Sequence, residues 1–313
     1  MKDTIVGNRS LSRFDVIIIG SGPTGSALAS ILCQNGQKVL ILEAGPNYYQ
    51  GLDDPSPGKP TSFFSNDEIK FIARGLVVPD ALAMPRTYRK SEMDGKPTRV
   101  GDVNQMPQTV GGGSVHADMK YPRFAPVDFQ LGTLLGTIPG ANFADWPVSY
   151  AELEPFYTHV EYSVGVQGKD GADPFEPPRS KPYPMAPGLA PYSGLLLAEG
   201  AKKVGYTAFP APTAINSRPR DGRPACRECG FCGGFGCPIN AKATSAVVTL
   251  RKALLTGNCQ LWSETRAIKL IRKNGQNTVR GVECLLPDGS RQTFTADRFV
   301  LACNAIEDAR LLL

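Results

Sequence analysis

The strongest pattern of hydrophobic and polar positions in this chain lies close to its start. Four consecutive β-branched residues, Val16 to Ile19, predict a buried strand that runs directly into a glycine-rich turn. Small and apolar residues over 26–32 then predict a helix, and a second apolar run, Val39 to Leu42, ends at Glu43. Strand, helix and strand in this order form one β-α-β unit and predict an α/β fold of the Rossmann type.

Weaker patterns predict the elements of the remaining chain. Ser149 and Glu152 match a capping box, and a helix with apolar spacing follows them. Further helices are expected over four ranges: 66–73, 195–204, 243–255 and 305–313. Strands are expected in four places, the middle two forming a hairpin: within 260–271, 281–286, 292–294 and 298–302.

The turn after the first strand carries a G-x-G-x-x-G pattern, whose residues are Gly20, Ser21, Gly22, Thr24 and Gly25. In a β-α-β unit such glycines allow a tight turn and let a diphosphate approach the positive end of the helix. Glu43 lies 23 residues after Gly20, where a carboxylate accepts hydrogen bonds from a ribose. The pattern predicts NAD or FAD rather than NADP; a tight turn without a ligand is the alternative.

A second glycine-rich turn follows later in the chain, over Val110, Gly111, Gly112, Gly113, Ser114, Val115 and His116. Three adjacent glycines expose backbone N–H groups to a bulky or anionic neighbour. A flexible surface loop is the alternative interpretation.

Composition narrows the classes of function. A hydrophobic content of 42% and a charged content of 20% are globular values, and 313 residues suffice for one large domain or two. The net charge of +5 is spread along the chain, so we expect no nucleic-acid partner. We expect no transmembrane segment, because no apolar run approaches eighteen residues. Residues 1–14 carry no export signal, so a cytoplasmic location is expected by default.

Four of the eight cysteines fall within twelve residues: Cys226, Cys229, Cys232 and Cys237. Intervening glycines permit a tight backbone, so the four thiolates can converge and bind an iron–sulfur cluster or zinc. Disulfides are the alternative in an oxidising compartment. The other four cysteines stand in apolar or strand-like settings, which indicates buried inert thiols.

Three further pairs of segments complete a family pattern: Val110–His116 with Tyr121–Phe124, Asp145–Tyr157 with Val164–Val166, and Val300–Glu307 with Arg310–Leu313. Together with the first turn, they resemble the glucose–methanol–choline (GMC) flavoprotein oxidoreductases, in the family's order and over nearly the whole chain. The resemblance implies FAD rather than NAD. Asp308 and Ala309 depart from the Thr-Pro of many relatives, which should not affect the cofactor.

The resemblance implies a discontinuous FAD-binding domain over 12–135 and 226–313, with an inserted, incomplete substrate-side segment over 136–225. The cofactor contacts that it implies are Gly20, Ser21, Gly22, Thr24, Gly25, Glu43, Ala44, Val110, Gly111, Gly112, Gly113, Ser114, His116 and Ala267. Some relatives join FAD covalently through a histidine at the position of His116, and others keep an unbonded histidine there.

The same resemblance implies an activity. Residues 216–224 and the cysteines after them look like those of bacterial sugar and polyol dehydrogenases of the gluconate or FAD-glucose dehydrogenase type. These oxidise CH–OH groups of sugars, polyols or other alcohols by hydride transfer to FAD. Electrons would then leave through an iron–sulfur cluster to a cytochrome c. In some relatives a small partner subunit carries the export signal, which makes a periplasmic location the alternative.

The family's catalytic histidine, with its His or Asn partner, lies near the C-terminus of its members, and neither His116 nor His159 matches that position. We therefore expect no catalytic residue in this chain, and we expect the chain to be the N-terminal portion of a longer protein. Two competing hypotheses are a GMC oxidase that uses oxygen and a truncated, non-catalytic fragment that binds flavin or metal.

Overall fold

The computed structural model describes residues 4–64, 87–88, 98–99, 107–141, 143–272 and 278–313. These residues divide into two compact units. The first unit comprises Met1–Asp118, Gly230–Asn240 and Thr244–Leu313, and the second comprises Met119–Cys229 and Ala241–Ala243. The helix expected over 66–73 lies outside the described residues. The division at 135/136 and 225/226 that the family pattern implies stays a prediction.

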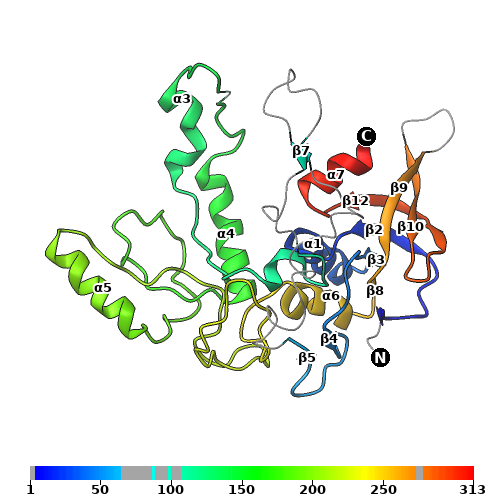
Figure 1. The fold of residues 1–313 in the computed structure, drawn as a ribbon, viewed down its shortest axis with the longest axis horizontal. Coiled ribbons are helices and arrows are strands. Elements are labelled where there is room, and N and C mark those ends of the chain that lie inside the picture. The colour runs from blue at the N-terminus through cyan, green and yellow to red at the C-terminus, as the bar shows by residue number, and fades with distance from the viewer. Residues whose placement is uncertain (1–3, 65–86, 89–97, 100–106, 142, 273–277) are drawn as a thin grey trace. The chain divides into compact units, whose positions relative to one another are not determined.

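The first unit is built around a five-stranded sheet with the strand order β1-β8-β3-β2-β12 (Figure 1). Its strands are β1 (Ile5–Gly7), β2 (Phe14–Ile19), β3 (Val39–Leu42), β8 (Cys259–Trp262) and β12 (Ala296–Leu301). Four of them, β8, β3, β2 and β12, run parallel, with Ile18 opposite both Ile41 and Val300. Strand β1 pairs antiparallel with β8 at one edge. This sheet confirms the predicted α/β fold of the Rossmann type.

Helix α1 (Pro23–Gln34) connects β2 to β3 and packs beside η5 (Ala246–Leu250) and α6 (Arg251–Leu255). A side chain at Gly25 would collide with the carbonyl oxygen of Gly20, so glycine allows α1 to pack close to β2. The continuous helix predicted over 243–255 is wrong in detail, because η5 is a turn of π-helix. Ser245, which precedes it, donates its backbone N–H to the Ser114 hydroxyl instead of starting an α-helix (3.0 Å).

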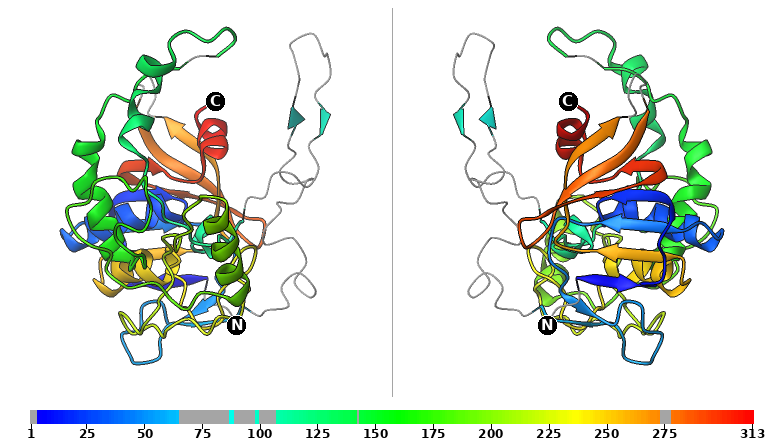
Figure 2. Two further views of the ribbon diagram at one scale, coloured as in Figure 1. Left: turned by 90° about the vertical axis from the view of Figure 1, so that its left-hand side faces the viewer. Right: turned by 90° about the vertical axis from the view of Figure 1, so that its right-hand side faces the viewer.

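A three-stranded antiparallel sheet packs on the five-stranded one (Figure 2). It consists of β9 (Arg266–Arg272), β10 (Val279–Leu285) and β11 (Arg291–Phe294), and β10 and β11 form the predicted hairpin. Both sheets share a core that includes Ile17, Leu40, Val282 and Phe294. The single strand predicted within 260–271 is two strands, β8 and β9, in different sheets. The chain bends between them at Glu264, which has a positive φ of 54°.

The remaining elements are shorter or belong to the second unit. The first unit also contains β4 (Tyr49–Gln50), β5 (Thr61–Ser62), β6 (Thr87–Tyr88), β7 (Thr98–Arg99), η3 (Gly112–Val115) and α7 (Ala305–Leu312). The second unit contains η4 (Pro126–Gln130), α3 (Leu131–Leu135), α4 (Tyr150–Val164) and α5 (Tyr192–Lys203). The predicted capping box is confirmed, because Glu152 accepts from the Ser149 backbone (2.8 Å) and donates its own N–H to the Ser149 hydroxyl (3.3 Å). Across the described ranges, no helix is both long and apolar enough to cross a membrane.

The second unit is held together by a buried guanidinium. The Arg123 side chain is 2% exposed and forms two hydrogen bonds to the carboxylate of Glu161, both 2.8 Å long. It also donates to Glu154 (2.9 Å), Tyr150 (3.1 Å) and Thr158 (3.0 Å). Burial alone would lower the pKa of Arg123, but these hydrogen bonds and the charge of Glu161 raise it above its ordinary value. Because every partner comes from or packs on α4, this cluster anchors the chain before η4 to that helix.

Replacing Arg123 with Met should lower the free energy of unfolding by about 3–5 kcal/mol, because two carboxylates would lose a buried positive partner. Urea denaturation measures this change. The matched control is Arg291→Met, which removes an exposed ion pair with Glu283 and should cost about 0–1 kcal/mol. Equal effects of the two substitutions would contradict this role for Arg123.

Candidate functional site

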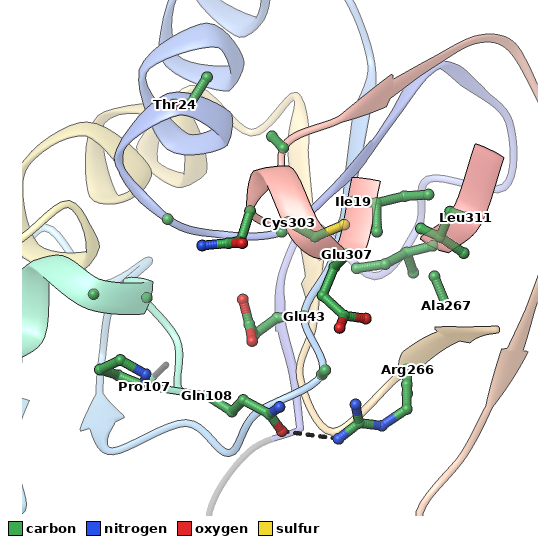
Figure 3. Close-up of a pocket in the computed structure, with 18 of the residues that line it drawn as sticks. Ile19, Thr24, Glu43, Pro107, Gln108, Arg266, Ala267, Cys303, Glu307 and Leu311 are labelled. Carbon is green, nitrogen blue, oxygen red and sulfur yellow. Dashed lines mark hydrogen bonds between the residues drawn. The ribbon is translucent and has the colours of Figure 1, made fainter. Parts of the chain in front are cut away.

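A cavity of about 360 Å³ opens in the first unit where the parallel strands β2, β3 and β12 end (Figure 3). In open α/β sheets, ligands bind outside the carboxyl ends of the strands. The volume exceeds the roughly 300 Å³ at which small-molecule pockets begin. Eight residues predicted from the sequence line it: Gly20, Gly22, Thr24, Glu43, Ala44, Gly112, Gly113 and Ala267.

The first glycine turn forms one wall of this cavity. Gly20 has a φ of +104°, and a side chain there would collide with the backbone of Ala302, the residue that directly follows β12. Gly22 differs, because its backbone is ordinary (φ −65°, ψ −175°) and no atom lies within 4 Å of the position of a Cβ. Gly20 is therefore required by the fold, whereas the bare backbone of Gly22 leaves open space in front of the N-terminus of α1.

Glu43 lies at the end of β3 and is only 7% exposed. One carboxylate oxygen accepts from the Ser21 hydroxyl (2.7 Å) and the Ser21 N–H (3.0 Å), and the other accepts from the Gly45 N–H (2.8 Å). Burial raises the pKa of Glu43 above its ordinary value, and these bonds and the charge of Arg266 oppose the rise. A ligand hydroxyl that donates to Glu43 would also favour its charged form.

The second glycine turn packs directly on the first. A Cβ at Gly112 would lie 3.0 Å from the Cα of Gly22, so the two turns approach as closely as backbones allow. Behind them, Ser114 and Ser245 both donate to the carbonyl of Gly111 (2.7 and 2.9 Å). The other predicted residues support the cavity rather than line it: Ser21, Gly25, Val110, Gly111, Ser114 and His116.

His116 follows η3 and is 5% exposed. Its imidazole meets the ring of Phe64 edge-on, with centroids 6.0 Å apart, and its carbonyl accepts from the Gly234 N–H (2.7 Å). The structure thus places His116 in a packed layer beside the second glycine turn.

The cavity has further polar residues in its walls. Thr265 and Arg266 belong to the stretch 265–267, which the family resemblance places at the adenine, whereas the sequence pattern did not identify Gln108, Cys303, Asn304, Glu307 and Arg310 as site residues. Arg266 donates to the side chain of Gln108 (2.8 Å; Figure 3). The Cys303 thiol donates to Asp308 (3.0 Å), and burial, followed by this bond, raises its pKa and so disfavours the thiolate. Cys303 and Asn304 come shortly after β12. A prediction that β12 pairs with β2 would have placed both residues at this cavity.

The four clustered cysteines are divided between the two units. Cys226 and Cys229 belong to the second unit and Cys232 and Cys237 to the first. All eight cysteines are among the described residues, and none forms a disulfide. In the part of the chain that the structure describes, no three His, Cys, Asp or Glu side chains gather as a metal site.

The second unit has a cavity of its own, more open and about 880 Å³ in volume. Aromatic residues Phe129, Trp146 and Tyr150 line it together with prolines and the carboxylates of Glu152 and Glu154. None of the residues predicted to contact a cofactor lies in this cavity.

The residues of the first cavity fit the ADP half of FAD. Bare backbone at Gly22 and Gly113, where a Cβ would meet no atom within 4 Å, leaves room for a diphosphate at the N-terminus of α1. The buried carboxylate of Glu43 offers acceptors for ribose hydroxyls. Apolar Ala267 and Leu311 line the far side, where the faces of a base could pack.

Two family models match the chain. The model described as GMC oxidoreductase matches residues 145–313, which is more than half of the chain. The model described as FAD binding domain matches residues 13–51, which contain β2, α1, β3 and Glu43. The second match supports FAD as the dinucleotide of the first cavity.

Individual proteins match over nearly the whole chain. The chain is 30% identical to the fructose dehydrogenase large subunit of Gluconobacter japonicus, over 98% of this chain and 55% of that protein. It is 32% identical to the 6'''-hydroxyparomomycin C oxidase of Streptomyces lividus, over 96% of this chain and 50% of that protein. The crystal structure of pyridoxine 4-oxidase from Mesorbium loti matches with a TM-score of 0.56 and 20% identity, over 96% of this chain and 51% of that one, which shows a shared fold. The chain thus spans about half the length of the curated relatives it matches.

Gly22→Val should abolish FAD binding and leave the fold intact, because its side chain would fill space that no protein atom occupies. Flavin absorbance of the purified protein measures binding, and circular dichroism checks the fold. Gly200→Val is the matched control, since its Cβ also meets nothing within 4 Å and it lies on α5 of the second unit, outside the residues that line the cavity. A Gly22→Val protein with a full complement of flavin would refute the assignment of this cavity.

Proposed function

Because the chain belongs to the GMC oxidoreductase family, we propose that it is the FAD-binding part of an enzyme that oxidises CH–OH groups. The proposed substrates are sugars, polyols or other alcohols. The observation that carries the proposal is the first cavity, in which two glycine turns and a buried carboxylate meet at the end of a parallel sheet. Relatives named for fructose and for 6'''-hydroxyparomomycin C support substrates that carry hydroxyl groups.

The proposed roles of the residues follow from their chemistry. Backbone N–H groups at the start of α1 would hold the diphosphate beside Gly22. Glu43 would accept the ribose hydroxyls, with Ser21 and Gly45 fixing its orientation. The second glycine turn, Gly111–Ser114, would lie along the diphosphate and the flavin, and the strand at Ala267 would flank the adenine.

Bound FAD would supply the redox chemistry by accepting a hydride from the carbinol carbon. The residues of this chain would bind and orient the cofactor and keep water from its adenosine half. We assign no catalytic acid or base to a residue of this chain. Substrate binding and proton removal are proposed for the part of the family's length that this chain does not span.

Two candidate routes by which electrons leave the flavin follow from this proposal. In the first, the four clustered cysteines hold an iron–sulfur centre that passes electrons to a cytochrome c, with a small partner subunit in the complex. Four reduced thiols within twelve residues support this candidate, which rests on residue type and spacing. In the second, the enzyme is an oxidase, which the similarity to a relative named as an oxidase favours.

Anaerobic purification with a visible spectrum tests these candidates together. We expect flavin bands and a broad iron–sulfur absorption, and we expect Cys232→Ser and Cys237→Ser each to lower bound iron while flavin stays in place. Cys284→Ala, at a buried cysteine outside the cluster, is the control and should keep its iron.

Each outcome has a distinct meaning. A chain that binds no flavin would contradict the proposed function as a whole. Flavin with no iron, or equal iron in all variants, would exclude the iron–sulfur candidate and leave the oxidase. Zinc in place of iron would indicate a structural role for the cysteines.

The flavin should be dissociable rather than joined covalently to His116. The imidazole already packs edge-on against Phe64, and this contact holds the ring in place without a covalent bond. Acid precipitation should therefore release the flavin into the supernatant. A yellow pellet from the wild type that turns colourless in His116→Ala, but not in His159→Ala, would instead demonstrate a covalent link at His116.

A further inference from the structure

Helix α7 contributes two charged residues to the cavity that the roles above leave unexplained. Glu307 and Arg310 both line it, and the Glu307 side chain is 13% exposed. Figure 3 shows the Glu307 carboxylate pointing into the cavity, on the side of Glu43 away from Thr24 and α1. Ala267 and Leu311 stand on the same side.

Arg310 fixes the position of this carboxylate. Its Nε donates to Glu307 (2.7 Å), and its Nη2 donates to the backbone carbonyl of Ala267 (3.1 Å). The guanidinium therefore ties α7 to the first residues of β9. As a result, Glu307 is held against the strand edge that forms the far wall of the cavity.

Helix stability alone does not account for this arrangement. An acid in the first turn of a helix and an Arg three residues later stabilise the helix by a few tenths of a kcal/mol, wherever the pair points. Such a pair would serve α7 equally well in solvent. Here the carboxylate is paired with Arg310 and also faces the cavity, so its acceptor oxygens can meet a donor on a bound ligand.

The order of groups along the cavity indicates which donor this is. With a diphosphate at α1 and a ribose at Glu43, the base of the nucleotide extends toward Ala267, Leu311 and Glu307. A carboxylate accepts hydrogen bonds and donates none. It would attract the 6-amino group of adenine and repel the 6-oxo group of hypoxanthine.

We propose that Glu307, anchored by Arg310, is the residue that selects adenine over 6-oxopurines at this site. The inference rests on the proposed function, because it requires a nucleotide in the first cavity. Sites that hydrogen-bond a specific ligand group discriminate strongly against an analogue that lacks it. Glu307→Gln should relax the selection, because an amide can donate to a 6-oxo group as well as accept from a 6-amino group.

Calorimetric titration of the full chain with ADP and with inosine diphosphate (IDP) tests this proposal. Production in a riboflavin-starved host keeps the site open to both probes. We expect the wild type to bind ADP at least about tenfold more tightly than IDP, since one charge-assisted hydrogen bond is at stake. Glu307→Gln should narrow this ratio to about threefold or less. Glu283→Gln, which alters another Glu paired with an Arg outside the cavity, should keep the wild-type ratio.

The outcomes separate the inference from the proposed function. If the wild type binds neither probe, both the nucleotide site and the inference are wrong. If it binds ADP and IDP equally, or if Glu307→Gln keeps the full preference, the nucleotide site stands and the role of Glu307 is wrong. Arg310→Gln serves as a second variant should Glu307→Gln not fold. It keeps the carboxylate but loses its anchor, so its ADP preference should also fall, and an unchanged preference there would overturn the proposal.

Discussion

The hydroxyl of Ser21 is the contact on which the candidate site depends. It donates to the buried carboxylate of Glu43 (2.7 Å) and accepts from the N–H of Gly111 (3.0 Å). One side chain thus joins the first glycine turn, the end of β3 and the second glycine turn, which are far apart in the sequence. Because the group is buried, each of these bonds is strong, and losing any of them would leave a polar atom without compensation.

This junction extends into a wider network of small hydroxyls. Ser26 donates to the Ser21 carbonyl (2.6 Å), and Ser114 and Ser245 hold the Gly111 carbonyl from the opposite side. The hydroxyls are small, so the two glycine turns can touch backbone to backbone at Gly22 and Gly112. The network therefore fixes an open, bare stretch of backbone in front of α1 before any ligand arrives. This pre-formed shape is what a diphosphate requires.

Local sequence patterns predicted the half of the site whose residues lie close together in the sequence. The β-branched run, the glycine motif and Glu43 form one continuous unit, so β2, α1 and β3 could be predicted with their functional ends. The opposite wall depends on long-range pairing. Glu307 and Arg310 reach the cavity only because β12 pairs with β2, and Arg266 only because the chain bends at Glu264 into a second sheet.

Other features could not be predicted from local sequence patterns alone. Ser245 lies in a segment whose sequence predicts an ordinary α-helix. The hydrogen bond from its backbone N–H to the Ser114 hydroxyl accounts for the π-helical turn that follows. The convergence of Cys226, Cys229, Cys232 and Cys237 on one centre stays a prediction from their spacing.

We propose that the end of the parallel sheet holds the ADP half of FAD. Hydrogen–deuterium exchange of the chain with and without FAD can test this proposal, because it reports on every segment that lines the cavity at once. We expect slower exchange at 19–25, 42–45, 107–114, 265–267 and 302–311, with no change at the second cavity, 126–130 and 145–154. Protection confined to the second cavity, or none at the sheet edge under conditions where FAD is bound, would contradict it.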